Sequence, residues 1–251
     1  MHAKARGAVA LLAVPVLLLA AGCSGEPADT KNRGEGKSSG RPPAAGAPAT
    51  SAAGLPASPA PGSPLRRAAL AQGDLEGYQI SDGAKNPSAP DGQPQADRAP
   101  CQPLADIMGD EPDPAARETV NRGIGSRTQL GLAVSASLSS YAEADARRLM
   151  AGLRSALGAC KDGFSATVEK QTGTYKDVRT AAYRVAGDES VSWTTTAAAE
   201  GVSAPVHLVV VREGATVVRL MALNVAGRGK AEVPHDLADK QLDKLSVALG
   251  H

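Results

Sequence analysis

The sequence contains few aromatic residues: one Phe, one Trp and four Tyr among 251 residues, all of them beyond residue 77. A hydrophobic core must therefore be built mainly from Val, Leu and Ala. The sequence also lacks an excess of either charge, because its 27 Lys and Arg residues are balanced by 26 Asp and Glu residues, which gives a formal net charge of +1. It contains no block of basic residues. We therefore expect no nucleic-acid partner and no electrostatic binding to anionic lipid.

Several signatures of catalysis are also lacking. The sequence has no S-x-x-K, phosphate-loop or dinucleotide-binding pattern. Neither His207 nor His235 falls in a metal-binding spacing such as H-E-x-x-H, and the acidic run from Asp110 to Asp113 lacks the ligand ladder of a calcium loop. His207 lies inside an apolar stretch, which favours a hydrogen-bonded structural role over that of a general base. We predict a protein that is not an enzyme and holds neither a metal nor a cofactor.

The start of the chain has the layout of a secretory signal peptide. Basic residues precede an apolar run from Ala8 to Leu19, and small residues follow it. The run is too short for a membrane span, which needs about 20 apolar residues. It ends in Ala20-Ala21-Gly22-Cys23.

With a cysteine directly after Ala-Ala-Gly, this stretch resembles the lipobox of bacterial lipoproteins, although position −3 is Ala20 where that family usually has Leu. The resemblance implies that Cys23 becomes the mature N-terminus and carries a diacylglycerol thioether, a palmitate-type anchor. The protein would then be held to the cell membrane on its extracytoplasmic face. An ordinary cleaved signal peptide is the alternative.

Two cysteines remain once Cys23 carries lipid. Cys101 and Cys160 show no C-x-x-C spacing, so a redox-active or zinc-binding role is not expected. Because the environment outside the membrane is oxidising, we predict a disulfide between them.

Composition divides the chain into a signal peptide (1–22), a Pro-, Ala-, Gly- and Ser-rich linker (23–65) and one domain (66–251). Along the domain, segments in which apolar and polar residues alternate with a period of two, as in strands, are interspersed with segments that carry an apolar stripe at helical spacing. We predict an α+β fold, a mainly antiparallel sheet with helices packed on one face and one disulfide. The expected strands are 75–80, 128–139, 164–169, 178–185, 191–198, 206–211 and 216–225, and the expected helices are 101–108, 114–122, 142–157 and 234–249.

A second resemblance rests on a Leu-x-Gly-Tyr start, a Cys-x-Pro-Leu helix, a helix closing on Gly-Ala-Cys and an apolar strand pair before a terminal helix. The residues are Leu75, Gly77, Tyr78, Cys101, Pro103, Leu104, Gly158, Cys160 and the pair spanning Val206–Val225. This pattern resembles the extracellular sensor domain of actinobacterial PknH-type Ser/Thr kinases, which is also found alone in lipoproteins. The resemblance implies an α+β sheet with a cleft and a sensing role with an unidentified ligand. Those kinase domains have two disulfides, whereas this chain has cysteines for one.

The candidate ligand-binding residues are small hydroxyl side chains on two predicted strands. Alternation places Ser135 and Ser137 on one strand, and Ser192, Thr194 and Thr196 on another, away from the apolar positions. If the two strands lie close together, these hydroxyls form the floor of a polar groove. The alternative is an ordinary exposed sheet face, which is also polar.

These observations favour a cell-surface lipoprotein whose tethered domain binds or senses a small-molecule, cell-wall or protein ligand. The alternative is a lipid or glycolipid carrier, whose apolar cavity would use residues such as Leu220, Met221 and Leu223. An envelope hydrolase is a weaker alternative.

Overall fold

The computed structural model describes residues 62–83, 85–87, 89, 92–110, 113–224 and 230–250. The predicted signal peptide and nearly all of the predicted linker lie outside the described residues. The chain divides into two units, Met1–Thr50 and Ser51–His251, and all of the description below concerns the second. Within the described ranges, no helix combines the length and the apolar character needed to cross a membrane.

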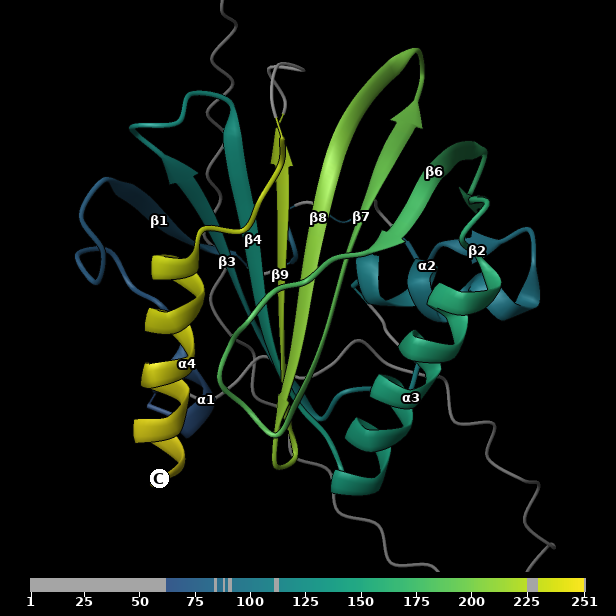
Figure 1. Cartoon of the computed structure of the whole chain (residues 1–251). Helices are drawn as coiled ribbons and strands as arrows, with labels where there is room; N and C mark the ends of the chain where they lie inside the picture. The colour runs from purple at the N-terminus through teal and green to yellow at the C-terminus, as the bar shows by residue number, and fades with distance from the viewer. Residues whose placement is uncertain are drawn as a thin grey trace, which may run out of the picture. The chain divides into compact units, whose positions relative to one another are not determined.

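The described domain is built on one nine-stranded antiparallel sheet (Figure 1). Its strand order is β1-β3-β4-β9-β8-β7-β6-β5-β2. The strands are β1 (Tyr78–Gly83), β2 (Gln95–Ala96), β3 (Glu118–Ser126), β4 (Leu132–Ser140), β5 (Phe164–Val168), β6 (Gln171–Thr180), β7 (Glu189–Ala199), β8 (Val202–Glu213) and β9 (Thr216–Asn224). The helices are α1 (Pro64–Ala68), the 3-10 turn η1 (Ala99–Cys101), α2 (Gln102–Met108), α3 (Glu143–Ala159) and α4 (His235–Leu249).

Both faces of the central strands are buried. In β8, Leu208 and Val210 face one core, whereas Val209 and Val211 face the other. Because a sheet with two apolar faces needs a cover on each, the helices divide between the faces. Figure 1 shows α3 and α2 beside β7 and β6, and α4 with α1 in front of β3 and β4.

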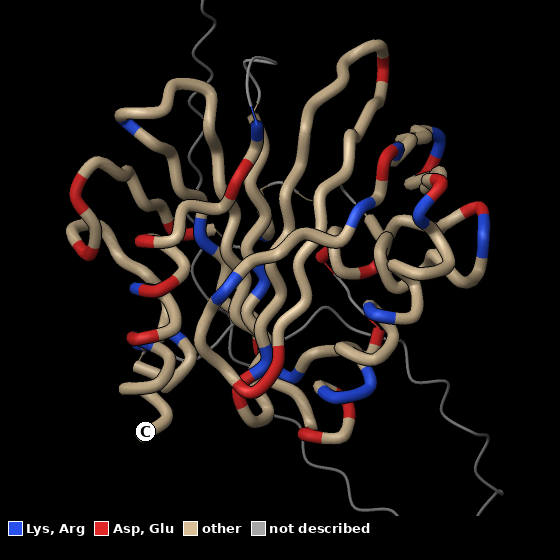
Figure 2. The backbone as a smooth tube through the Cα atoms, viewed as in Figure 1, with Lys and Arg blue, Asp and Glu red and all other residues tan. Residues whose placement is uncertain are grey.

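The α3-side core joins α2 and α3 to the sheet. It contains Leu149 and Leu153 from the predicted apolar stripe of α3, together with Trp193 of β7, which is 1% exposed. The α4-side core joins α1 and α4 to the opposite face and contains Leu237 and Leu245. Figure 2 shows that most Lys, Arg, Asp and Glu residues lie on helices and connections around these cores.

The prediction of an α+β fold with a mainly antiparallel sheet is confirmed, with one correction. The helices were expected on one face, and they cover both. The reason is the doubly apolar character of β8 and β9, which leaves no solvent-facing side in the middle of the sheet.

One strand was predicted as a helix. Residues 114–122 were expected to add a helical turn, but residues from Glu118 onwards form β3, which pairs with β1 and β4. The segment contains Gly123 and Gly125, and few β-branched residues, so its own propensity favours no strand. β3 is a strand because β1 and β4 pair with it on both sides and satisfy its backbone hydrogen bonds.

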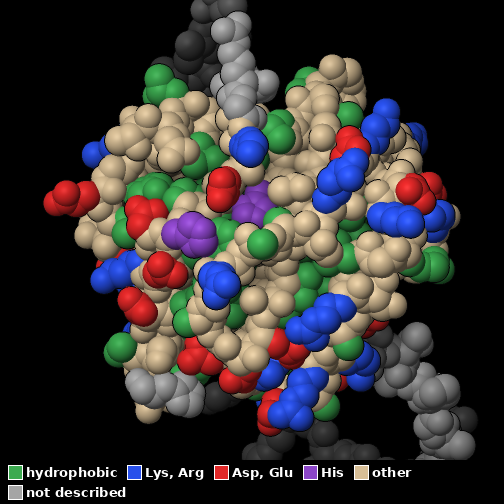
Figure 3. Space-filling view, in the orientation of Figure 1, with side chains coloured by type: hydrophobic (Ala, Val, Ile, Leu, Met, Phe, Trp, Pro, Cys, Tyr) green, Lys and Arg blue, Asp and Glu red, His purple; other side chains and the backbone are tan. Residues whose placement is uncertain are grey.

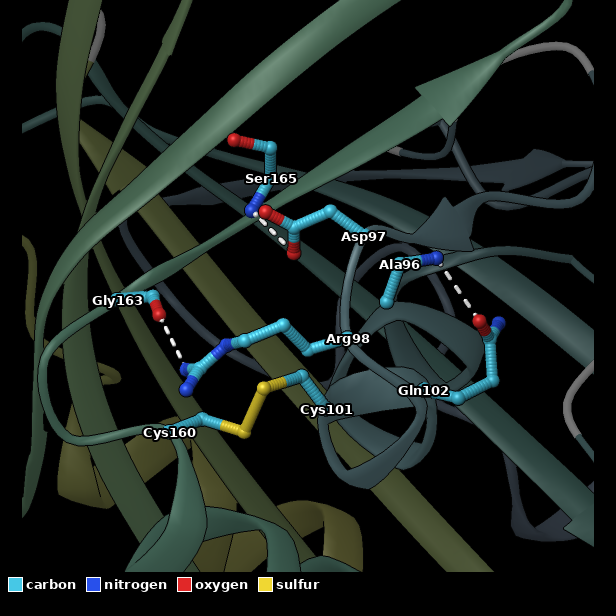
Figure 4. The surroundings of a disulfide bond; sticks show 8 residues. All are labelled: Ala96, Asp97, Arg98, Cys101, Gln102, Cys160, Gly163 and Ser165. Atoms are coloured by element: carbon cyan, nitrogen blue, oxygen red, sulfur yellow. Dashed lines mark hydrogen bonds between the residues drawn. A yellow bond between two sulfur atoms is a disulfide. The ribbon is translucent and has the colours of Figure 1, made fainter.

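The predicted disulfide is confirmed. Cys101 and Cys160 are joined, with Cα atoms 5.8 Å apart, and both are fully buried. Figure 4 shows how the bond ties the end of α3 to the turn before α2. Nearby, the Arg98 guanidinium donates to the carbonyl of Gly163 over 2.6 Å, which fastens the same two segments a second time.

Candidate functional site

A pocket of about 450 Å³ opens on the α4 side of the sheet, where β6 ends beside β7 and β8. We call it the β7–β8 pocket. In the space-filling view, histidine side chains lie at the middle of this face, with acidic and basic side chains around them (Figure 3). The lining residues are Asp177, Arg179, Ala181, Ala182, Tyr183, Thr194, Thr195, Thr196, Pro205, Val206, His207, Lys230, Ala231 and Glu232.

Strand register sets the floor of the pocket. Thr194 of β7 lies opposite His207 of β8, so their side chains share one face of the sheet. The neighbouring strand β6 is irregular here: its register with β7 shifts between Lys176 and Arg179, and Asp177 has φ 55°. After Thr180 the chain leaves the sheet, and Figure 1 shows it crossing in front of the central strands.

His207 is held as a neutral imidazole with a fixed tautomer. The backbone N–H of Val233 donates to Nδ1 over 3.0 Å, so Nδ1 carries a lone pair and Nε2 carries the proton. That Nε2 lies 2.8 Å from Oγ of Ser192, to which it donates. Burial lowers the pKa of His207, against the attraction of Glu232, because the charged form would lose its hydration.

This hydrogen-bonding order opposes catalysis by a Ser–His pair. A general base must accept the hydroxyl proton of serine through a free Nε2, while its Nδ1–H is held by an acceptor. Here Nδ1 faces a donor, which fixes the proton on Nε2, next to Ser192. The pair therefore links β7 to β8 and to the segment before α4 as a structural element, as predicted for His207.

Tyr183 forms a wall of the pocket. Its ring stacks on that of His235 with centroids 4.2 Å apart, and its hydroxyl donates to the carbonyl of Val233 over 3.1 Å. Burial raises the pKa of Tyr183, and the carboxylates of Asp239 and Glu232 raise it further, so the phenol stays neutral. Tyr183 and His207 thus both fasten the segment before α4, which carries the opposite wall.

Each wall of the pocket carries one cation and one anion. Asp177 and Arg179, on β6, form an exposed ion pair of 3.2 Å. Lys230 and Glu232, on the segment before α4, are both exposed. Between them lie the threonine hydroxyls and a patch of Ala, Pro and Val side chains. Such a site offers paired charges, neutral hydrogen-bonding groups and some apolar surface, which suits a polar ligand of low net charge.

The structure divides the five predicted ligand-binding residues between opposite faces of the sheet. Thr194 and Thr196 line the β7–β8 pocket, and Ser192 lies beneath it as the partner of His207. Ser135 and Ser137 face the α3 side, where both are buried. The groove floor of five hydroxyls therefore does not form, because the two strands expose their hydroxyl sides in opposite directions.

Ser137 belongs instead to a buried cluster around Arg219 of β9. It accepts a hydrogen bond from the Arg219 guanidinium and donates to Oδ1 of Asn121 over 2.6 Å. The same guanidinium donates to the carbonyl of Ile107 at the end of α2 over 2.8 Å. Burial lowers the pKa of Arg219 to about 10, so it is still cationic at neutral pH. It binds the carbonyl end of α2 to the sheet, where the helix dipole favours a cation.

Sequence reasoning missed several residues of the β7–β8 pocket. Tyr183, Arg179, Lys230 and Glu232 were not among the predicted ligand-binding residues. No local pattern marks them, since they lie on a strand end and on an irregular segment brought together by folding. Predicted lipidation at Cys23 lies outside the described residues. Among the residues that the structure places, no group of three or more His, Cys, Asp or Glu is arranged to hold a metal ion.

Comparisons with known proteins identify little. No family model matches the chain, and no curated protein matches it. Among solved structures, it is similar to the extracellular domain of PknH from Mycobacterium tuberculosis, with a TM-score of 0.46 and 12% sequence identity, over 74% of this chain and 95% of that chain. That is the type of domain that its cysteine and glycine pattern resembles. A similarity of this size assigns no function to the chain.

Proposed function

We propose that this chain is a cell-surface lipoprotein whose tethered extracytoplasmic domain binds a small polar ligand in the β7–β8 pocket and acts without catalysis. The observation that carries the proposal is the pocket itself. Its volume of about 450 Å³ falls within the range of small-molecule sites. Its walls are fastened by His207 and Tyr183, both of which are held in their neutral forms. A site with walls fixed in this way loses little entropy on binding.

The proposed location rests on two features. The first is the predicted lipid at Cys23, which would anchor the protein outside the membrane. The second is the buried disulfide, since such bonds form and persist in oxidising compartments. The linker between residues 23 and 65 would then serve as a tether that gives the domain access to its surroundings.

Binding to a lipid or glycolipid finds less support. Two of the residues considered for an apolar cavity, Leu220 and Met221, are buried in the cores on opposite faces of the sheet. Leu223 packs against the α3-side core. All three therefore act in packing, and none of them lines the β7–β8 pocket.

Thermal unfolding with a panel of soluble probes tests the proposal. The panel contains a zwitterionic dipeptide, a neutral disaccharide, an anionic and a cationic amino acid, and a short-chain lipid. A probe that binds at 100 times its Kd stabilises the protein by about 2.7 kcal/mol, or a rise in Tm of roughly 5–10 °C for a domain of this size. We expect that rise from the zwitterionic or the neutral probe.

Two variants show whether the rise comes from the β7–β8 pocket. Thr194→Leu fills the floor and should remove it. Thr172→Leu makes the same change at an exposed position of β6 outside the pocket and should preserve it. A rise of equal size in both variants, or a response to the lipid alone, contradicts binding of a polar ligand at this site.

A further inference from the structure

A small cavity of about 150 Å³ lies between α2 and α3, which Figure 1 shows next to each other. We call it the α2–α3 cavity. Ile107, Leu149 and Leu153 form apolar parts of its lining, and all three belong to the α3-side core. One water takes about 30 Å³ of the liquid, so the cavity has room for about five groups of that size.

Both helices of the cavity are fastened in place. The Cys101–Cys160 disulfide joins the start of α2 to the end of α3. At the other end of α2, the guanidinium of Arg219 donates to the carbonyl of Ile107 over 2.8 Å. A site whose walls are held in this way loses little entropy when a ligand fills it.

Asp106 brings a buried carboxylate to the cavity. The residue is 7% exposed, and its Oδ1 accepts from the side-chain amides of Gln93 and Gln102 over 2.7 Å each. No described residue donates to Oδ2, yet solvent reaches this oxygen, and the space that Asp106 lines is the α2–α3 cavity. Burial raises the pKa of Asp106, and the two neutral amides only oppose that rise. A buried carboxylate held by neutral groups alone is one that a cation would stabilise.

The other charges of the cavity leave it anionic. Asp113 lines it and forms no ion pair with any residue that the structure describes. The charge of Asp113 also raises the pKa of Asp106, which places the two carboxylates within electrostatic reach of each other. Arg148 is the one cation of the lining, and its guanidinium is paired with Asp145 at 2.8 Å. Two carboxylates therefore remain without a cation.

Gly152 of α3 keeps the cavity open. A glycine inside a helix destabilises it relative to alanine. Packing does not require glycine at this position, because an added Cβ would meet the Cβ and Cγ atoms of Pro103 at 3.8 Å, an ordinary contact. Pro103 also lines the cavity, so a side chain at position 152 would occupy part of the space.

The lining favours an organic cation over a metal ion. Across the part of the chain that the structure describes, no three His, Cys, Asp or Glu residues are grouped to hold a metal. Apolar walls offer no ligands to a hard cation such as calcium, which takes six to eight oxygens. They do offer contacts to an alkyl stem, and a primary ammonium has three N–H donors that carboxylates accept.

We propose that the α2–α3 cavity binds a small organic cation, a primary ammonium group on a short alkyl stem. The ammonium donates to Oδ2 of Asp106 and is attracted by Asp113, while the stem packs against Leu149 and Leu153. The site differs from the β7–β8 pocket in its residues and in the charge of its ligand. It does not depend on binding at that pocket.

Titration with n-butylammonium tests the site, with 1-butanol as a neutral probe of the same size. Amide resonances of the full chain are followed by NMR to about 50 mM probe at constant ionic strength. We expect the N–H signals of Asp106, Ile107 and Gly152 to shift with n-butylammonium. Binding of 1-butanol should be at least tenfold weaker, because it cannot form charge-assisted hydrogen bonds with the carboxylates.

A third probe, Nα-acetyl-lysine methylamide, separates two sources of the same ammonium group. Binding at least as tight as that of n-butylammonium would assign the ligand as a lysine side chain. Weaker binding would assign it as a free amine.

Two matched pairs of variants isolate the cavity. Asp106→Asn keeps an oxygen for the two amide donors and removes the charge, whereas Asp162→Asn removes an exposed carboxylate outside the cavity. Gly152→Ala fills part of the cavity, whereas Gly158→Ala adds the same methyl group to α3 at a point with nothing within 4 Å. We expect n-butylammonium to bind at least tenfold more weakly to Asp106→Asn and at least threefold more weakly to Gly152→Ala. Both controls should bind within twofold of wild type.

Four results would overturn the proposal: absence of shifts to about 50 mM, equal binding of 1-butanol, equal binding by the two members of either pair, or the same shifts with calcium at a lower concentration than with n-butylammonium. The last result would assign the cavity to a metal ion. If Asp106→Asn does not fold, the comparison of Gly152→Ala with Gly158→Ala decides.

Discussion

Replacing Arg219 by Met should destabilise the domain, although the substitution removes a buried charge. Met has nearly the shape of the arginine stem and lacks its hydrogen-bond donors. The change leaves the carbonyl of Ile107 and the hydroxyl of Ser137 without the donor that each now has. Both atoms lie where water has little access, since Ile107 is 5% exposed and Ser137 is 8% exposed.

The magnitude follows from two opposed contributions. Leaving a buried polar group unpaired costs about 1–3 kcal/mol, so two such groups give roughly 2–6 kcal/mol. Removing a desolvated guanidinium recovers part of that, because burial already opposes its charged form. We expect a net loss of about 2–4 kcal/mol. Ser137→Ala, which keeps the cation and removes one acceptor, should cost about 1–2 kcal/mol.

Urea unfolding followed by far-UV circular dichroism measures both variants. The midpoint should fall while the slope of free energy against urea stays constant, since the substitution does not change how much surface becomes exposed on unfolding. Arg147→Met on the exposed face of α3 is the control, and it should change stability by less than about 0.5 kcal/mol because its ion pair with Glu143 is exposed. An Arg219→Met midpoint equal to that of the control would refute the role of Arg219 in holding α2 to the sheet.

Three further predictions concern the disulfide, His207 and Cys23. Replacing Cys101 and Cys160 together by Ser opens a loop of 59 residues and should cost about 4 kcal/mol of stability in the chain-entropy model. Urea unfolding of the oxidised wild type and of the variant measures this loss, and a loss below about 1 kcal/mol would contradict the prediction. His207 has a folded pKa below its unfolded value of 6.5. The stability that its neutral form contributes is therefore present above pH 6.5 and is lost as the pH falls below 6.5. The slope of this loss is at most about 1.4 kcal/mol per pH unit. His207→Gln should flatten this dependence, and an unchanged curve in that variant would show that another group titrates. Cys23→Ser should leave the protein in cells as an uncleaved precursor or release it to the medium, and a variant that still partitions into detergent at the mature mass would exclude lipidation at Cys23.

Local patterns predicted most elements that are periodic in sequence. The stripe of Ala146, Leu149, Met150, Leu153 and Leu157 predicted α3, and all five side chains are buried in the structure. Alternation predicted β7 and β9 to within a few residues. These predictions hold because an amphipathic period and an element length are properties of the segment itself. Where the period is weak, as in β3, the segment takes its conformation from its neighbours in the sheet.

The direction of each hydroxyl side depended on pairing across the sheet. Alternation places Ser135 and Ser137 opposite the apolar side of β4, and it places Ser192 and Thr194 opposite the apolar side of β7. It does not say which core each apolar side joins. That choice was made by register: Ser135 lies opposite Met221, in the α3-side core, whereas Ser192 lies opposite Val209, in the α4-side core. The two serine and threonine sets look alike in sequence, but strand register places them on opposite faces of the sheet, because a shift of one residue turns a side chain to the other face.

By itself, the sequence determined the pairing of Cys101 with Cys160 and the helices and strands with strong periods, whereas the division into leader, linker and domain stays a prediction. These depend on composition, on counting, and on contacts between residues close together along the chain. The tertiary structure alone decided that helices cover both faces, and that Tyr183, His207 and the segment before α4 enclose a pocket. The pocket depends on where the chain turns after Ala181, and this turn is set by packing against strands and helices remote in sequence. Helices cover both faces because β8 and β9 are apolar on both sides.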